Sequence, residues 1–314
     1  MKPAVFIPII IGSLLLTAGA VVFGIGLASA SKNTTKVTTP YELEETITGF
    51  DIDLDTSNLE FKVSTDDSKK VICNENKKNH HEVKVVDSVL TIKQIDERKW
   101  HEKLFDFSFN YMKVEVYLPS SLYNSLSIHS STGDIVIPHD YSFNSVDIKL
   151  NTGNVSFKSN VATSINIEAS TGDITISDLN TNQLTINTST GDITANNVAV
   201  VDKAIFKAST GKIRLNNLTA ANLDVNTSTG DVTLTNTVIL NHINIHCSTG
   251  DVKLEDSDAK TLNIETSTGD ITGTLLTEKR FFAHSHTGKV DVPETDGERC
   301  DINTDTGKII IKIR

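Results

Sequence analysis

The side chains with the clearest chemical potential are aspartates that follow a repeated glycine. Six of them recur along the chain: Asp134, Asp173, Asp192, Asp231, Asp251 and Asp270. If the segments that carry them stack on one another, their carboxylates form a column. Such a column suggests calcium binding. The spacing of 19 or 20 residues differs from the nine-residue calcium-binding repeats, and no Gly-Gly-x-Gly-x-Asp is present. A hard cation also needs six or more converging oxygens. We therefore expect no metal ligands and no cofactor here.

The histidines are the second group with metal-binding potential. His129, His246 and His284 each lie four residues before a glycine, and His286 follows His284 by two. Residues two apart on a strand point to the same side, so His284 and His286 form a pair. A transition-metal site needs at least a third ligand, and none is evident. We interpret these histidines as outward-facing surface residues.

No sequence motif indicates catalysis. The chain has no nucleophile elbow, no His-Glu-x-x-His and no P-loop. Polysaccharide lyases and hydrolases also use stacked β-coils, but glycoside hydrolysis needs paired carboxylates beside a cleft. The repeats described below are nearly free of insertions that could build a cleft. We predict that the protein is not an enzyme, with a carbohydrate-active enzyme as the less favoured alternative.

The positioning element is the pentapeptide Ser189-Thr190-Gly191-Asp192-Ile193, which returns ten times with small changes. Its glycines, which we assign to structural turns, are Gly133, Gly153, Gly172, Gly191, Gly211, Gly230, Gly250, Gly269, Gly288 and Gly307. Consecutive glycines are 19 or 20 residues apart. This regularity is typical of a stacked repeat, in which each unit buries its apolar face against its neighbours.

Within each repeat, apolar residues alternate with polar ones. In one coil Leu184, Ile186 and Ile193 are apolar, and the residues between them are largely polar. This period of two predicts half-buried strands, and glycine supplies the positive φ of the turn that joins them. The threonine before each glycine is expected to form a ladder of hydroxyl hydrogen bonds. The predicted fold is all-β: a single-stranded parallel β-helix (β-solenoid) of about 19-residue coils. An antiparallel sandwich is the alternative.

The amino-acid composition argues against one class of function. The net charge of −11 and the aromatic content of 6% argue against nucleic-acid binding, which needs a basic face or a stacking platform. The three cysteines are far apart and do not suggest a disulfide framework. Cys247 and Cys300 fall at packing positions, where a thiol behaves as a small hydrophobe.

Residues 1–31 are predicted to form an N-terminal transmembrane helix that precedes the solenoid. The stretch from Ala4 to Ala28 carries no charge and is long enough to span a bilayer. A cleaved signal peptide is the alternative, because Ala28-Ser29-Ala30 resembles a cleavage site. Both interpretations place the bulk of the chain outside the cytoplasm, and we expect a single-pass protein of the cell membrane.

The remaining chain divides into three parts. Residues 32–46 are predicted as a polar linker, residues 47–118 as degenerate N-terminal coils and a cap, and residues 119–314 as the regular repeats. The loop at 94–112 is interpreted either as an end cap or as a contact patch. The final strand Ile309–Ile313 is expected to form an open edge, where copies could polymerise end to end as a structural assembly.

The repeated Ser-Thr-Gly-Asp-Ile, the segment Val114–Pro119 and the apolar N-terminus resemble one known family over residues 40–314. It is the bacterial β-strand-repeat family of adhesin-like, toastrack-type (DUF4097-type) proteins, which includes LiaG-like envelope proteins. The resemblance implies a membrane-tethered, extracytoplasmic binding or envelope-stress-sensing module without catalytic residues. The expected partners are the membrane, an envelope protein or cell-wall glycan, and further copies of the chain through the solenoid ends.

Overall fold

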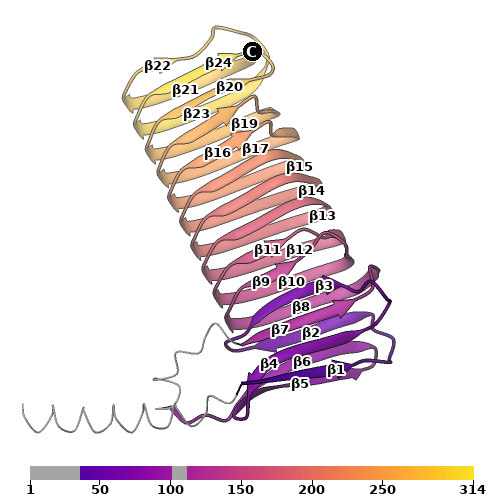
Figure 1. Cartoon of the computed structure of the whole chain (residues 1–314). Helices are drawn as coiled ribbons and strands as arrows, with labels where there is room; N and C mark the ends of the chain where they lie inside the picture. The colour runs from indigo at the N-terminus through magenta and orange to yellow at the C-terminus, as the bar shows by residue number, and fades with distance from the viewer. Residues whose placement is uncertain (1–35, 101–111) are drawn as a thin grey trace, which may run out of the picture.

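A stack of flat coils forms an elongated rod in the computed structural model, which describes residues 36–100 and 112–314 (Figure 1). These residues contribute 24 strands to one continuous sheet. Equivalent positions of successive coils pair in parallel, so that Val225 lies between Phe206 and Ile245. The prediction of an all-β parallel solenoid is confirmed, and the antiparallel sandwich is excluded for the repeats.

Each coil has one strand before its glycine and one after it. The strands before the glycines are β8 (Leu122–Thr132), β10 (Ser142–Thr152), β12 (Asn160–Thr171), β17 (Val238–Thr249), β19 (Asp258–Thr268), β21 (Lys279–Thr287) and β23 (Glu298–Thr306). The strands after them are β9 (Ile135–Ile137), β11 (Val155–Phe157), β16 (Val232–Thr235), β18 (Val252–Glu255), β20 (Ile271–Leu275), β22 (Val290–Asp291) and β24 (Ile309–Ile313). In mid-stack one long strand joins two turns: β13 (Ile174–Thr190), β14 (Ile193–Thr210) and β15 (Ile213–Thr229).

The repeated glycines lie at the turns, one above another, with φ between 135° and 159°. Stacking adds a second requirement for glycine. A Cβ on Gly172 would lie 1.8 Å from the carbonyl oxygen of Gly153 in the neighbouring coil, and a Cβ on Gly191 would lie 2.0 Å from that of Gly172. Only a residue without a side chain allows this close approach of backbones. The predicted ladder of threonine hydroxyl bonds is not formed among the described residues, although Thr190 and Thr210 are paired in register.

A second column of residues with left-handed backbone conformation lies in mid-stack. It forms the corner that follows the second strand of each coil. Asp178, Asn197, Asn217, Asn236 and Asp256 have φ between 46° and 55°. Asparagine and aspartate tolerate this conformation better than other non-glycine residues. The side-chain amide of Asn217 also donates to Asn197 Oδ1 at 2.8 Å, so the corner is hydrogen-bonded from coil to coil.

Inward-facing residues of all coils merge into one apolar core. The positions five and seven before each glycine are buried, as the alternation predicts, except in the outermost coil, where Phe281 and Ala283 are half-buried. Towards the N-terminal end the core is aromatic. Phe50 packs edge-on against Phe61 and Tyr123, with ring centroids 5.3 Å and 5.0 Å apart, and Phe143 continues the cluster at 6.2 Å.

The N-terminal end departs from the repeat because it contains antiparallel strands. It is built from β1 (Lys36–Glu42), β2 (Gly49–Leu54), β3 (Asn58–Val63), β4 (Lys70–Asn76), β5 (Asn79–Val86), β6 (Val89–Asp96) and β7 (Lys113–Leu118). On one face β5 pairs antiparallel with β6, and on the other β4 pairs antiparallel with β7 and β1. The reversed strands β4 and β5, together with the edge strand β1, close this end of the stack, and we call these three strands the N-terminal cap.

Two expectations for this region differ from the structure. Residues 36–42 of the segment expected as a polar linker at 32–46 form strand β1, an edge strand that accommodates Pro40 because an edge residue can lack a ladder hydrogen bond. The expected loop at 94–112 begins later, since Gln94 to Asp96 still belong to β6. The rest of that loop, residues 101–111, lies outside the described residues.

At the C-terminal end the order of coils in space differs from their order in sequence. Strand β19 pairs with β23 instead of β21, and β20 pairs with β24 instead of β22. The last coil is therefore inserted, and the coil with β21 and β22 lies outermost (Figure 1). The expectation that Ile309–Ile313 forms the open edge needs correction: β24 pairs with β20 along its length and with β22 at Ile309 and Ile310, so β21 and β22 are the outermost strands.

Within the described ranges, 36–100 and 112–314, no helix is long and apolar enough to span a bilayer. The predicted anchor at 1–31 lies outside them.

Candidate functional site

The aspartates after the glycines have a structural role in the turn. Each accepts a hydrogen bond from the backbone N–H of the equivalent residue in the next coil: Asp192 N–H donates to Asp173 Oδ1 at 2.8 Å, and Lys212 N–H donates to Asp192 Oδ1 at 2.8 Å. Asn154 fills the same role towards Asp173, at 2.9 Å. A side-chain oxygen is therefore what the position requires, and this column satisfies backbone donors that would otherwise have no partner in the protein.

Interspersed cations neutralise part of this column. Lys212 Nζ lies 3.0 Å from Asp231 Oδ2, and Arg214 Nη1 lies 2.8 Å from Asp192 Oδ2. The hydrogen bond from the Lys212 ammonium and the one from the Asp251 backbone N–H hold the pKa of Asp231 below its usual value. The carboxylates thus point to lysine, arginine and backbone N–H groups, an arrangement that stabilises the turns.

A polar groove of about 740 Å³ runs along the outer side of the strands that precede the glycines. One wall consists of the polar residues four before each glycine: Lys149, Glu168, Asn187, Lys207, Asn226 and His246. The floor towards the turns is formed by the residues two before each glycine, which are serine except in the first coil: Asn151, Ser170, Ser189, Ser209, Ser228 and Ser248. The hollow exists because each coil places a larger side chain beside a smaller one. From Lys149 to His246 it spans five coil steps, or about 24 Å at ~4.8 Å per step.

The groove offers hydrogen-bonding groups of both kinds with charges of both signs. Asn187 Oδ1, in the middle of the wall, is buried and has no hydrogen-bond partner among the described residues. This acceptor has almost no surface exposed to the groove, so its missing hydrogen bond costs free energy and gives a ligand in the groove no contact. Two lysines and one glutamate line the groove, so it differs from the rest of this acidic chain.

The histidines of the sequence analysis are dispersed. His246 lies in the groove wall with Nδ1 3.4 Å from Glu265 Oε2, His129 is exposed on β8, and His284 and His286 are on the outermost strand β21. No cluster of metal-ligand type includes any of the four within the part of the chain that the structure describes.

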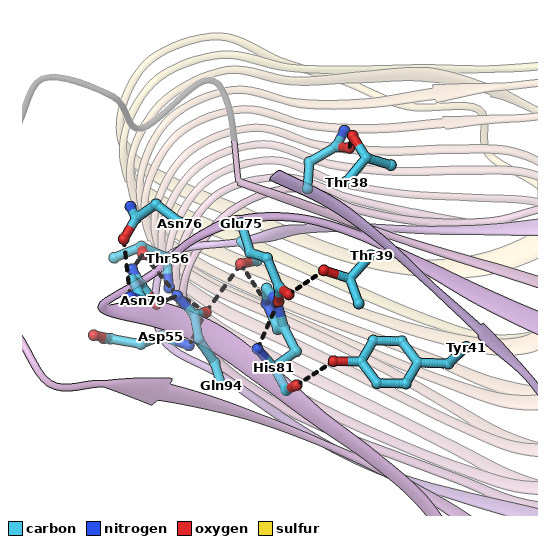
Figure 2. A network of polar contacts seen from close by, with 12 residues as sticks. Thr38, Thr39, Tyr41, Asp55, Thr56, Glu75, Asn76, Asn79, His81 and Gln94 are labelled. Carbon is cyan, nitrogen blue, oxygen red and sulfur yellow. Dashed lines mark hydrogen bonds and ion pairs between the residues drawn. The ribbon is translucent and has the colours of Figure 1, made fainter. Parts of the chain in front are cut away.

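A buried polar network in the N-terminal cap was not predicted. Figure 2 shows Glu75 of β4 and His81 of β5 pointing toward one another, with Thr39 and Tyr41 of β1 on one side and Gln94 of β6 on the other. His81 Nδ1 lies 3.1 Å from Glu75 Oε2, and His81 Nε2 lies 3.0 Å from Ser57 Oγ. Tyr41 donates to the backbone carbonyl of His81 at 2.8 Å. The network joins strands of both faces at the end of the stack.

Burial governs the electrostatics of this network. Glu75 and His81 are 6% and 1% exposed. Burial raises the pKa of Glu75, but hydrogen bonds from His81 and Thr39 outweigh it and hold the pKa below its usual value. The carboxylate is therefore ionised inside the cap.

Ser57, His81 and Glu75 have the spacing of a serine–histidine–carboxylate relay, but they do not form an accessible nucleophile. Ser57 is 1% exposed and donates its proton to Gln94 Oε1 at 3.0 Å. It occupies the glycine position of a degenerate turn, beneath Gly133. A substrate carbonyl cannot reach this hydroxyl in the described structure, so the arrangement stabilises the turn.

The fold and the groove together define a class of protein: a parallel β-solenoid with a continuous polar surface along its strands. The family described as toastrack DUF4097 matches residues 47–137 and 135–312. The chain belongs to this family. A comparison with curated proteins gave no match.

Solved structures share the fold at low sequence identity. A "putative adhesin" from Parabacteroides merdae has a TM-score of 0.51 at 12% identity, over 78% of this chain and 98% of that one. A "putative adhesin" from Bacteroides fragilis has a TM-score of 0.41 at 15% identity, over 90% and 98%. A "putative lipid binding protein" from Parabacteroides distasonis has a TM-score of 0.45 at 14% identity, over 89% and 98%.

Proposed function

We propose that the protein is a non-enzymatic, membrane-anchored binding module of the cell envelope that holds a linear polar polymer, cell-wall glycan, along its groove. The observation that carries the proposal is the groove itself, about 740 Å³ in volume and continuous over successive coils. Residues 1–31 supply the anchor, and the solenoid projects from the membrane surface.

A linear polymer suits the groove because the groove is itself a linear repeat. Each coil presents one long polar side chain and one small one, at a rise of ~4.8 Å per coil. A chain of sugar rings presents hydroxyl donors and acceptors at a comparably short, regular interval. Serine hydroxyls and asparagine amides both donate and accept, so they can match such a ligand in several registers.

The groove favours binding over cleavage. Glu168 is its only lining carboxylate, whereas glycoside hydrolysis normally uses a pair. Lys149, Lys207 and His246 lie on different coils and do not converge on one point. A set of weak, repeated contacts gives adhesion through many sites at once.

The test is co-sedimentation of the purified full chain, in detergent, with isolated cell-wall sacculi. Ser189→Trp and Ser209→Trp place two indoles on the groove floor, and we expect the double variant to lose at least about tenfold in affinity because large side chains fill the space. Val201→Trp is the matched control, because Val201 is 74% exposed and lies outside the groove.

Equal binding by the groove double variant and the parent chain would contradict the proposal. Release of soluble sugar fragments from the sacculi would contradict the non-enzymatic part separately. Loss of binding in Val201→Trp alone would move the binding surface to another side of the solenoid.

A further inference from the structure

The N-terminal cap contains three side chains of types that bind metal ions, and all three lie outside the groove. Cys73 and Glu75 of β4 and His81 of β5 are all buried, and their ligand atoms lie within 4.8 Å of one another. Residues 73 and 75 are two apart on a strand, so both point to the same side. Thiolate, carboxylate and imidazole are the three ligand types of protein zinc sites.

The direction of the hydrogen bonds shows which histidine nitrogen is available. Gln94 Oε1 accepts from the backbone N–H groups of Asp55 and Thr56, at 2.8 Å and 2.9 Å, which fixes the orientation of the amide. An amide oxygen only accepts, so the Ser57 hydroxyl donates its single proton to it. Ser57 Oγ must then accept from His81, and Nε2 carries a proton.

His81 Nδ1 therefore faces Glu75 Oε2 across 3.1 Å, with the Cys73 thiol beside the pair. Because Nε2 is directed at Ser57, Nδ1 is the ring nitrogen that a metal ion between Glu75 and Cys73 would use. Cys73 packs in the apolar core, and its thiol adds a third ligand type to the histidine and the carboxylate.

We infer that Cys73 Sγ, a Glu75 carboxylate oxygen and His81 Nδ1 form a site for a borderline divalent cation, Zn²⁺ above all. A dication with one thiolate and one carboxylate is electrically neutral, which suits a buried position. Binding displaces the thiol proton, and any proton held between His81 Nδ1 and Glu75, to solvent. A solvent molecule completes the tetrahedron.

Surrounding groups orient the ligands in the way that metal sites require. His81 Nε2–H donates to Ser57, which fixes the ring, and Thr39 donates to the other carboxylate oxygen of Glu75. Burial raises the pKa of the Cys73 thiol when no metal is bound, so binding depends on pH. Because β4 and β5 both supply ligands, the ion would fasten the antiparallel strands of the cap to each other.

The test uses the full chain in detergent, without a histidine tag, stripped with a chelator and titrated with Co²⁺ and Zn²⁺. We expect one equivalent of Co²⁺ with a thiolate-to-cobalt absorption band, displaced by Zn²⁺, and a higher Tm in the loaded protein. Cys73→Ser should abolish the band and weaken binding by more than the 10–100-fold typical of an orienting residue. Ser57→Ala, which leaves all three ligands, should weaken it about tenfold.

The matched controls are a second buried core thiol, Cys300, and the exposed histidine pair. Cys300→Ser and the double variant His284→Gln, His286→Gln should bind as the parent chain does, because neither contributes a ligand. If the parent chain gives no thiolate band, or if Cys73→Ser binds equally well, the three side chains do not form a metal site, and the cluster is a hydrogen-bonded part of the cap only. If Cys73→Ser unfolds by circular dichroism, Ser57→Ala still tests whether the cap binds the ion.

Discussion

The ammonium of Lys279 lies 2.8 Å from Asp258 Oδ1, and both side chains are buried, with 3% and 7% exposed. Thr277 bridges the pair, because its hydroxyl donates to Asp258 Oδ2 at 2.7 Å and accepts from Lys279. Asp258 begins β19 and Lys279 begins β21, the strand displaced to the outside by the inserted last coil. The ion pair therefore lies where the order of the coils in the stack first departs from their order in the sequence.

Lys279→Met should detach the outermost coil. Removing one partner of a buried ion pair leaves the other charge without compensation, a cost of about 3–5 kcal/mol. We expect faster amide hydrogen exchange in β21 and β23, with mid-stack strands unchanged. Lys308→Met is the matched control: its pair with Asp270, at 3.1 Å, is about half exposed and contributes about 0–1 kcal/mol. Equal exchange in both variants would show that the buried pair does not hold the coil.

Gly191→Ala should destabilise the middle of the stack. The added Cβ meets the Gly172 carbonyl oxygen at 2.0 Å and forces alanine to φ 145°. The conformation alone costs about 1–2 kcal/mol, and the backbone clash adds to it. Denaturant unfolding measures the loss. Gly49→Ala is the control, since the nearest atom to its Cβ is the Ser125 Oγ at 2.9 Å, at the end of a side chain, and its φ is not left-handed. A loss no larger than that of the control would contradict the stacking argument.

Acid should weaken the turns through the aspartate column. Hydrogen bonds from Lys212 to Asp231 and from the backbone N–H of Lys308 to Asp270 lower both pKa values in the folded state. A lowered folded pKa stabilises the protein above the unfolded pKa of about 3.9, and that contribution disappears as the pH falls through the folded pKa. Tm should therefore be steady near neutral pH and fall below about pH 4.

Replacing these carboxylates with amides tests the origin of this pH dependence. Asn154 already accepts the Asp173 backbone N–H at 2.9 Å, so Asp231→Asn and Asp270→Asn keep the acceptor and remove the titration. The double variant should lose little Tm at pH 7 and lose less than the parent on acidification. If the Tm of the double variant fell as steeply on acidification as that of the parent, other carboxylates would be responsible for the acid sensitivity.

Phe143→Ala should open a cavity in the aromatic core. Phe143 is fully buried and contacts the rings of Phe50, Tyr123 and Phe157. Truncation of such a ring typically costs about 3–5 kcal/mol. Chemical unfolding followed by near-UV circular dichroism measures both stability and loss of aromatic packing. Phe282→Ala is the control, because that ring is 48% exposed and should cost far less. Equal losses would mean that the cluster is not the stabilising element of this end.

The regular coils were predictable because one physical requirement recurs in every repeat. A turn with positive φ needs Gly191 and its equivalents, and alternation places Ile186 and Ile193 in the core, so pattern and fold agree. The role of Asp192 was less evident, because its partner, the Lys212 backbone N–H, is 20 residues away in sequence and adjacent only after stacking.

The ends were harder to predict because no repeat constrains them. Strand β1 pairs with β4 across 28 to 40 residues, and a polar segment such as Thr38-Thr39-Pro40 gives little signal for it. Nothing in the sequence connected Cys73 and Glu75 with each other or placed His81 beside them. The groove depended on the positions of small residues such as Ser189 on the outer face, where the alternation only predicts polarity.

The inserted last coil has a consequence for how the chain matures. In the finished molecule β21 has no partner on β19, so residues 279–291 cannot take up their final place before residues 298–313 have been synthesised. During synthesis this segment either stays unpaired or pairs temporarily and is then displaced by residues 298–313. The rod is thus closed at this end by residues 279–291, whose position depends on a coil that follows them in the sequence.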